Sequence, residues 1–262
     1  MLLGYCKIGA GFIGNGRFNE QRIPISLFKE MTKNGLQIFT KTKVIEMKKK
    51  EVREILEGVM FPFLQAEFGM SRVRDGSDHI FAKLDVEIDC ASPVLLILVT
   101  GSEFGYRVSP ILSMSSKTVD RPGNVRSKKR HDLLNAIYER MRGKDTRYTF
   151  VFTTEEELRA YLDELMAFLK TEGRKFWERF ATLASIERYL NADPTIPVEY
   201  GFVGTARAKD ALTLAKMMGR TDLEELEAAY LKLFEHPRQK GLVTPNAIKE
   251  FLEYSKWLRE TQ

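Results

Sequence analysis

Cysteine is scarce in this chain of 262 residues, which has two, Cys6 and Cys90, far apart and without a C-x-x-C spacing. Two such residues support neither a disulfide framework nor a structural zinc site. Histidine is also rare: His79, His131 and His236 are scattered, and none has a metal-ligand spacing such as H-E-x-x-H. We therefore predict no metal and no cofactor, and we interpret Cys90 as a small buried residue rather than a nucleophile.

The chain also lacks long hydrophobic runs and the common catalytic signatures. No apolar segment approaches the roughly 20 residues that a membrane span requires, and the N-terminus has no apolar region followed by a small-residue cleavage site. There is no G-x-S-x-G nucleophile elbow and no P-loop. We therefore expect a cytoplasmic protein with no membrane partner, and we favour a binding protein over an enzyme.

A glycine-rich stretch near the N-terminus, residues 9–14, does match the dinucleotide-binding pattern G-x-G-x-x-G. That pattern binds a pyrophosphate only where a buried strand precedes it and a helix begins within it. Here Asn15-Gly16-Arg17 follows the motif, and Pro24 stands where the helix interior should be. We interpret residues 1–46 as a loosely ordered basic, Gly-rich extension, and we hold as a hypothesis that Met47 is the natural start.

The periodicity of the remaining chain predicts an α+β fold. Apolar residues recur at helical spacing over residues 47–68, and Gly69 ends that pattern. Three strand patterns follow with short connections, over residues 79–89, 94–100 and 106–114, which predicts antiparallel neighbours. We therefore expect an antiparallel sheet, a meander of about 4 strands, packed with helices. We assign residues 47–195 to this core domain and residues 196–262 to an all-helical C-terminal lobe.

Capping residues mark the starts of several later helices. After a predicted strand at residues 148–152, Thr154 and Glu157 form a capping-box pattern that begins a helix interrupted at Gly173. A second such pattern, Thr221 to Glu224, predicts another helix start, and Thr244-Pro245 predicts a third. The aromatic residues of the helical stretch that begins at Thr154 follow the helical period, so we expect them to pack in the core.

Positive charge is concentrated in two segments. Residues 1–50 carry ten bases and three acids, and residues 117–147 carry ten bases and four acids. Because the whole chain carries +5, the residues outside these segments together carry −8. An acidic body with two basic segments favours a polyanion, such as nucleic acid, or an acidic protein surface as partner.

The second basic segment contains a long polar loop, residues 113–129, and long loops are often functional. We expect a helix to begin at Arg130-His131 and to run to Met141, so that the preceding cations and the helix N-terminus form an anion site. The predicted binding residues are the bases of this region: Lys117, Arg121, Arg126, Lys128, Lys129, Arg130, Arg142 and Arg147.

An alternative is a metal-dependent nuclease. Asp85, Glu87 and Asp89 alternate along one predicted strand and therefore share one face of it, where they form a ladder of carboxylates. Such a ladder is usually the solvated face of a half-exposed sheet. A restriction-type site would also need Glu-x-Lys on the next strand, whereas Glu103-Phe104-Gly105 has glycine in place of the lysine.

The order of elements, helix, meander, capped helix and helical tail, looks like that of small accessory or immunity proteins from bacterial toxin and phage-defence loci. No sequence motif carries this resemblance, which is one of architecture alone. It implies a non-enzymatic accessory role, in which the basic loop recognises nucleic acid or an acidic protein.

Overall fold

The computed structural model describes the backbone of residues 5–7 and 22–24, and residues 47–73, 80–84, 91–102, 105–119, 131–143, 151–202, 204–236 and 243–261. The chain divides into two compact units, Met1–Lys43 and Val44–Gln262. In the first, β1 (Tyr5–Lys7) pairs antiparallel with β2 (Arg22–Pro24). The glycine motif at residues 9–14 lies outside the described residues, and the predicted boundary at residue 195 stays a prediction.

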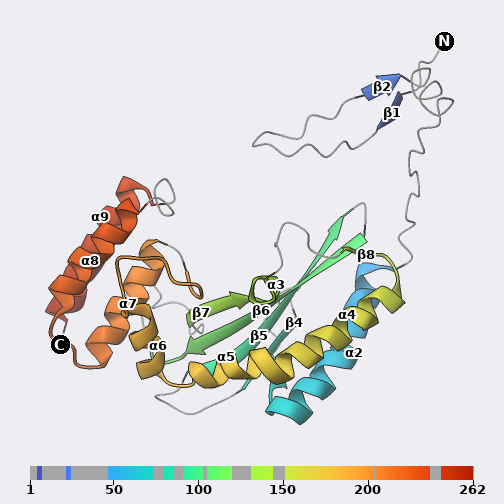
Figure 1. Ribbon diagram of the computed structural model, residues 1–262, viewed down its shortest axis with the longest axis horizontal. Coiled ribbons are helices and arrows are strands. Elements are labelled where there is room, and N and C mark those ends of the chain that lie inside the picture. Colours follow the sequence, from blue (N-terminus) through green and yellow to red (C-terminus); the bar gives the residue numbers. More distant parts are fainter. Residues whose placement is uncertain are drawn as a thin grey trace. The chain divides into compact units, whose positions relative to one another are not determined.

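The second unit contains a six-stranded antiparallel sheet (Figure 1). Its strands are β3 (Ser71–Arg72), β4 (Ile80–Lys83), β5 (Ser92–Ser102), β6 (Gly105–Ser116), β7 (His131–Ile137) and β8 (Val151–Phe152). The order is β3-β4-β5-β6-β7, and β8 pairs with the far end of β6. From β3 to β7, strands that follow one another in sequence are therefore neighbours in space, which confirms the predicted α+β class with its meander.

One face of this sheet forms the hydrophobic core. Leu95 and Ile97 of β5 lie opposite Leu112 and Pro110 of β6, and Leu112 in turn lies opposite Ala136 of β7. All of these side chains are buried. Because side chains alternate along a strand, the residues between them point to that opposite face.

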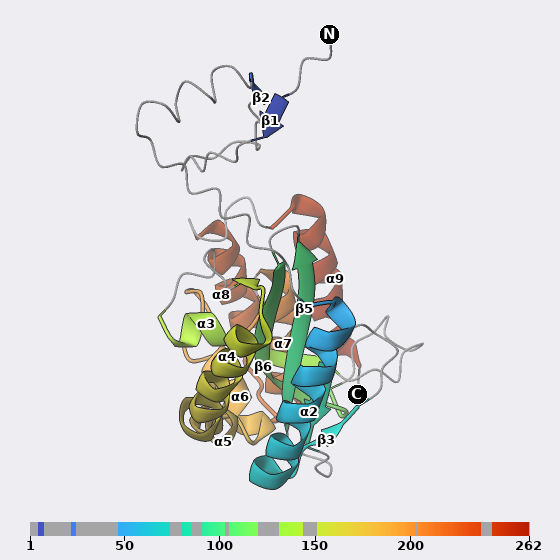
Figure 2. The same cartoon turned by 90° about the vertical axis from the view of Figure 1, so that its right-hand side faces the viewer.

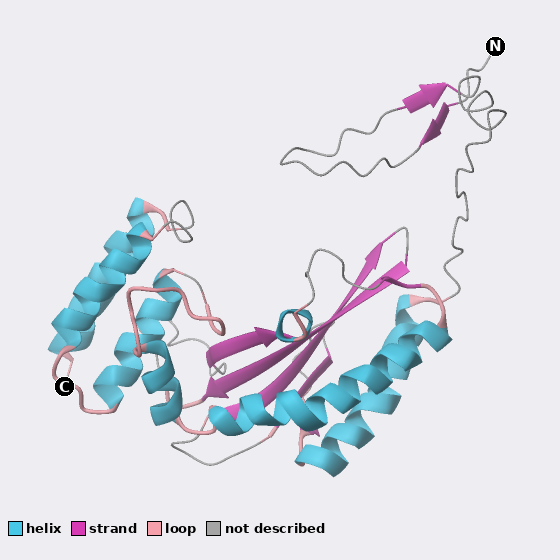
Figure 3. Cartoon of the chain, in the orientation of Figure 1, coloured by secondary structure: helices cyan, strands magenta, loops and turns pink. Residues whose placement is uncertain are grey.

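Helices α2 (Lys49–Phe68) and α4 (Glu155–Phe168) lie side by side on the core face (Figures 1 and 3). Helix α4 continues through the π-helical turn η2 (Leu169–Gly173) into α5 (Arg174–Arg179), and α6 (Leu183–Leu190) follows in the chain. Figure 2 shows α2 running alongside β5. Helix α2 continues through Pro62 and ends at Gly69, whose φ of +67° suits glycine.

Gly173 explains the interruption predicted in the second helical stretch. It ends η2, and a Cβ placed on it would lie 3.3 Å from Leu112 Cδ2 and 3.0 Å from Leu169 Cδ2. Glycine therefore allows the helical backbone to approach the sheet at this point. At the start of α4, Thr154 Oγ1 accepts a hydrogen bond from the Glu157 N–H at 3.3 Å, which confirms the predicted cap. The Glu157 carboxylate, however, accepts from the N–H of Thr153 at 2.9 Å, one residue before the expected partner.

The C-terminal part is helical, with α7 (Thr205–Met217), α8 (Leu223–Glu235) and α9 (Pro245–Glu260). Helix α9 starts as predicted, because Thr244 Oγ1 accepts from the Ala247 N–H at 3.2 Å. The capping box expected at Thr221 is wrong: Asp222 is the N-cap residue, and its side chain makes no cap hydrogen bond. Its carboxylate instead accepts from Arg220 Nε at 2.8 Å, so a salt bridge replaces the cap.

The predicted helix over residues 130–141 is also wrong, because this segment forms β7 and only one helical turn, α3 (Tyr138–Met141). Met114 of β6 lies opposite Leu134 and Ser115 lies opposite Asp132, so Leu133 is the extra residue of a β-bulge. The bulge buries Leu133 and Leu134 together. Two adjacent buried leucines followed by Ile137 and Tyr138 imitate helical spacing. Since no helix begins at Arg130, the proposed helix-terminal anion site does not exist.

Candidate functional site

Most of the side chains predicted to form a site lie outside the described residues. This holds for the carboxylate ladder, Asp85, Glu87 and Asp89, and for six of the predicted basic residues, Arg121, Arg126, Lys128, Lys129, Arg130 and Arg147. Two predicted residues, Lys117 and Arg142, are described, and both are exposed. Lys117 follows directly after β6.

Arg142 is held by the protein's own side chains. Its Nη1 atom donates to Tyr138 Oη at 2.6 Å and to Glu164 Oε2 at 2.7 Å, and its guanidinium lies over the Tyr138 ring. The hydrogen bond to the Glu164 carboxylate raises the pKa of Arg142. We therefore assign Arg142 a structural role, in which it ties α3 to α4, and leave it out of the candidate interface.

The basic connection, residues 117–130, is tethered to one end of the sheet. Its neighbours in the chain, Ser116 and His131, lie opposite one another in the β6–β7 ladder. Ser116 Oγ lies 2.8 Å from Thr118 Oγ1 and accepts from the Thr118 N–H at 3.1 Å, which fixes the path of the chain as it leaves β6. The 14 residues of the connection carry six bases and one acid. Both ends of the connection are therefore anchored at the β6–β7 ladder, while all of its bases except Lys117 lie outside the described residues.

The face of the sheet opposite the core carries a mixed surface, which we call the open sheet face. It consists of three cross-strand pairs between β5 and β6: Thr100 with Arg107, Leu98 with Ser109, and Leu96 with Ile111. Thr100 and Arg107 are exposed and the other four are half-buried. The half-buried apolar residues Leu96, Leu98 and Ile111 do not belong to the described hydrophobic core. The long helices α2 and α4 lie on the other side (Figure 3).

Helix α3 closes a gap in the sheet beside this face. Strands β7 and β8 pair with different parts of the same edge of β6, leaving residues 108–110 between them. Pro110, which lies opposite Ile97 of β5 on the other edge, has no N–H to donate and is tolerated beside this unpaired part of the strand. Glu139 of α3 and Tyr161 of α4 cover this gap: the Tyr161 hydroxyl lies 3.5 Å from the Val108 carbonyl and 3.4 Å from Glu139 Oε1. Burial raises the pKa of the Glu139 carboxyl, which is 3% exposed.

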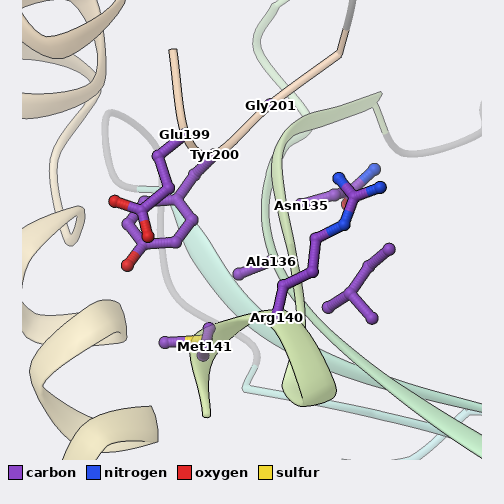
Figure 4. A pocket seen from close by; sticks show the side chains of 8 residues that line it. Asn135, Ala136, Arg140, Met141, Glu199, Tyr200 and Gly201 are labelled. Carbon is purple, nitrogen blue, oxygen red and sulfur yellow. The ribbon is translucent and has the colours of Figure 1, made fainter. Parts of the chain in front are cut away.

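A small pocket lies at the outer edge of β7, where α3 meets the segment 199–201 (Figure 4). Its volume is about 110 Å³. Asn135 and Arg140 lie on one wall, and Glu199 and Tyr200 lie on the opposite wall. Since Asn135 pairs with Ser113 and Ile137 pairs with Ile111, the pocket adjoins the open sheet face. The Asn135 carboxamide oxygen accepts from the Ser113 hydroxyl, which leaves its amide nitrogen as a donor.

The wall that carries Tyr200 is rigidly positioned. The Gly201 N–H donates to the Asn135 carbonyl at 3.2 Å, and the Tyr200 N–H donates to the Tyr189 hydroxyl at 2.8 Å. The Tyr200 ring stacks with Tyr189 at 6.2 Å and meets Phe176 edge-on at 5.3 Å. Burial, together with the neighbouring Glu199 carboxylate, raises the pKa of Tyr200. Aromatic packing therefore preorganises this side of the pocket.

Sequence patterns do not reveal the Glu199–Gly201 wall. These residues lie between α6 and α7 in a segment without period, and their partner on β7 is more than sixty residues earlier in the chain. The signal that exists is a weak one: an aromatic residue next to an acid and a glycine in a polar connection. Arg140, by contrast, lies within the basic segment that the charge distribution singles out.

Comparisons of the chain with protein-family models, with curated proteins and with solved structures found no match. In the described ranges, no group of three or more His, Cys, Asp and Glu side chains is arranged to hold a metal ion. No helix in the same ranges has the length and apolar character needed to cross a membrane.

Proposed function

We propose that this protein is a non-catalytic module that binds single-stranded nucleic acid across the open sheet face. The observation that carries the proposal is the Ser116–His131 pairing at the end of the β6–β7 ladder, because the sequence between these two residues contains six bases and one acid. Phosphates of the bound strand contact these basic side chains together with Arg107, while the nucleobases rest on the half-buried apolar residues.

The composition of the open sheet face favours a single strand over a duplex. Leu96, Leu98 and Ile111 offer apolar contact to base faces, and Ser109 offers a hydroxyl. A duplex hides its base faces and presents phosphates and groove edges, which these aliphatic residues would not engage. A flat platform with cations at its margins is the arrangement by which proteins hold unpaired bases and track the backbone.

Nucleic acid is favoured over an acidic protein because the cations are accompanied by a pocket with a tyrosine ring. An acidic protein surface requires positive charge alone, whereas an unpaired base also requires an aromatic or apolar surface on which to stack. Tyr200, in the pocket at the outer edge of β7, supplies that surface. An acidic protein partner, which needs only positive charge, can therefore be distinguished from nucleic acid by competition with a polyanion that has no bases.

Fluorescence anisotropy with labelled single strands and duplexes, measured across a salt series, tests the proposal. We expect the single strand to bind more tightly, and log Kd to rise with log salt by about 0.7 for each phosphate engaged. Replacing Lys128, Lys129 and Arg130 with alanine should weaken binding and lower that slope by about 2, since three contacts are lost.

A charge-matched control separates the loss of specific phosphate contacts from the effect of a lower net charge. Lys50, Arg159 and Lys175 are exposed residues on α2, α4 and α5, each paired with an acid three or four residues earlier or later in the chain. Their triple alanine variant loses the same charge from the helical side and should bind like the parent protein. Equal losses in both triples, or no binding at low salt, would refute the proposal. Equal competition by polyglutamate and by the oligonucleotide would instead indicate an acidic protein partner.

A further inference from the structure

We propose that the pocket at the outer edge of β7 takes a guanine base, held between the Glu199 carboxylate and the Arg140 guanidinium. This inference rests on the proposed function and names the base that the nucleic acid presents. Arg140 and Glu199 line opposite walls of the pocket (Figure 4). The Glu199 carboxylate accepts a hydrogen bond from the Tyr200 hydroxyl, and its remaining lone pairs can accept from a ligand.

The size of the pocket limits its ligand to part of a nucleotide. At about 110 Å³ it is far smaller than the roughly 300–1,000 Å³ of a site that encloses a whole small molecule. One planar ring system can enter, while the sugar and phosphate remain outside. Arg107, exposed on the open sheet face, provides positive charge for the strand outside the pocket. The pocket therefore suits a base splayed out of a single strand rather than a complete nucleotide enclosed on all sides.

The polar groups of the walls match guanine better than the other bases. An ionised carboxylate such as Glu199 only accepts hydrogen bonds, and guanine has two adjacent donors, N1–H and the N2 amino group, on its Watson–Crick edge. A guanidinium such as Arg140 only donates, and guanine has two adjacent acceptors, O6 and N7, on its other edge. Adenine, cytosine and uracil each place at least one acceptor where the carboxylate requires two donors.

Tyr200 supplies the stacking surface that this arrangement needs. Its ring is fixed by Tyr189 and Phe176, and its backbone is held through the Tyr189 hydroxyl. The adjacent Gly201 N–H is bonded to the Asn135 carbonyl of β7, which joins the two walls of the pocket. A base stacked on a ring that is already immobilised loses little further entropy from the protein side. Tyr200 should therefore contribute equally for every base, whereas Glu199 and Arg140 should discriminate among them.

The test uses short uridine-rich oligonucleotides of equal length that differ in one central base. Anisotropy should show guanine bound about 5- to 150-fold more tightly than adenine, cytosine or uracil, the range expected for a bidentate contact. Glu199→Gln should remove most of that preference, and Tyr200→Leu should weaken all four oligonucleotides alike. Glu156→Gln, on the exposed face of α4, is the matched control and should change nothing.

Base analogues assign the individual contacts. Inosine lacks the N2 amino group, so it should bind more weakly than guanine to the parent protein and equally well to Glu199→Gln. 7-Deazaguanine lacks N7, so its penalty should disappear in Arg140→Ala. If the analogue penalties persist unchanged in these variants, the assigned contacts are wrong. Thermal unfolding of each variant shows whether it retains the fold.

Failure of this inference is distinguishable from failure of the proposed function. Tight binding of all four oligonucleotides without a preference would overturn the guanine site and leave the nucleic-acid module intact. Direct binding of free GMP but not AMP in calorimetry, without any oligonucleotide binding, would support the guanine site and refute the proposed strand-binding role. Binding of neither free nucleotide nor oligonucleotide would overturn both.

Discussion

Gly105 begins β6 at the point where β8 crosses its edge, and we predict that alanine there destabilises the fold more than at any other tested glycine. Its φ is +136°, a conformation that residues with a Cβ rarely adopt. A Cβ built on Gly105 would lie 2.5 Å from the Phe152 carbonyl oxygen and 2.7 Å from Val151 Cγ1. The first of these is backbone, and β8 holds it in place through its pairing with Tyr106 and Arg107.

The expected magnitude combines two effects. Holding a non-glycine residue in such a backbone region costs about 1–3 kcal/mol. Forcing an extra carbon into a packed site typically costs about 1–3 kcal/mol more, because strand β8 must move away from β6. We therefore expect Gly105→Ala to lower the free energy of unfolding by about 2–6 kcal/mol.

Two other glycines separate these effects. Gly143 has a φ of +68° with nothing within 4 Å of an added Cβ, so Gly143→Ala should show the backbone cost alone, about 1–2 kcal/mol. Gly58 lies on the exposed side of α2 with the same free space, so Gly58→Ala should stabilise the protein by about 0.5–1 kcal/mol through helix propensity.

Chemical denaturation of the three variants and the parent protein, followed by circular dichroism, gives the order. We expect Gly58→Ala to unfold at the highest denaturant concentration, then the parent, then Gly143→Ala, then Gly105→Ala. If Gly105→Ala were no less stable than Gly143→Ala, the close approach of β8 to β6 would be wrong. The surface that β8 helps to position, around Arg107, would then need another explanation.

Three further predictions follow from buried or capping groups. Burial raises the pKa of Glu139 above its ordinary value of 4.5, so the folded state holds its proton more tightly than the unfolded state. The stability of the parent relative to Glu139→Gln should therefore fall as the pH rises above about 4.5, and denaturation curves at several pH values would show no such trend if the carboxyl were solvated. Arg207, 2% exposed, donates to the carbonyls of Leu190, Asp193 and Ile196. Arg207→Ala should cost about 3 kcal/mol or more in thermal denaturation, since each carbonyl left without a donor costs about 1–3 kcal/mol, whereas the exposed Arg188→Ala should change stability by less than about 0.5 kcal/mol. Removing a confirmed helix cap, by Thr154→Ala or Thr244→Ala, should each cost about 1 kcal/mol, and a null effect in both would mean that neighbouring groups replace the cap.

The success of the helix predictions and the failure over residues 130–141 have related causes. Helix starts at Thr154 and Thr244 depend on hydrogen bonds to residues three positions away, so the local sequence contains both partners. The prediction of a capping box at Thr221 failed where Asp222 forms a salt bridge with Arg220. Arg220 also pairs with Glu187, which is distant in the sequence. Residues 131–137 became a strand because β6 offered a paired edge and a bulge accommodated Leu133.

The sequence by itself determined the α+β class, the α2 and α9 boundaries and the concentration of positive charge between β6 and β7, because periodicity, capping and charge are local properties. The tertiary structure decided which face of the sheet the helices leave open and which residues form the pocket. Glu199 and Tyr200 meet Arg140 only because the Gly201 N–H bonds to Asn135 across the edge of β7. A contact between residues so far apart in sequence depends on how the whole sheet and its helices pack, which no local pattern encodes.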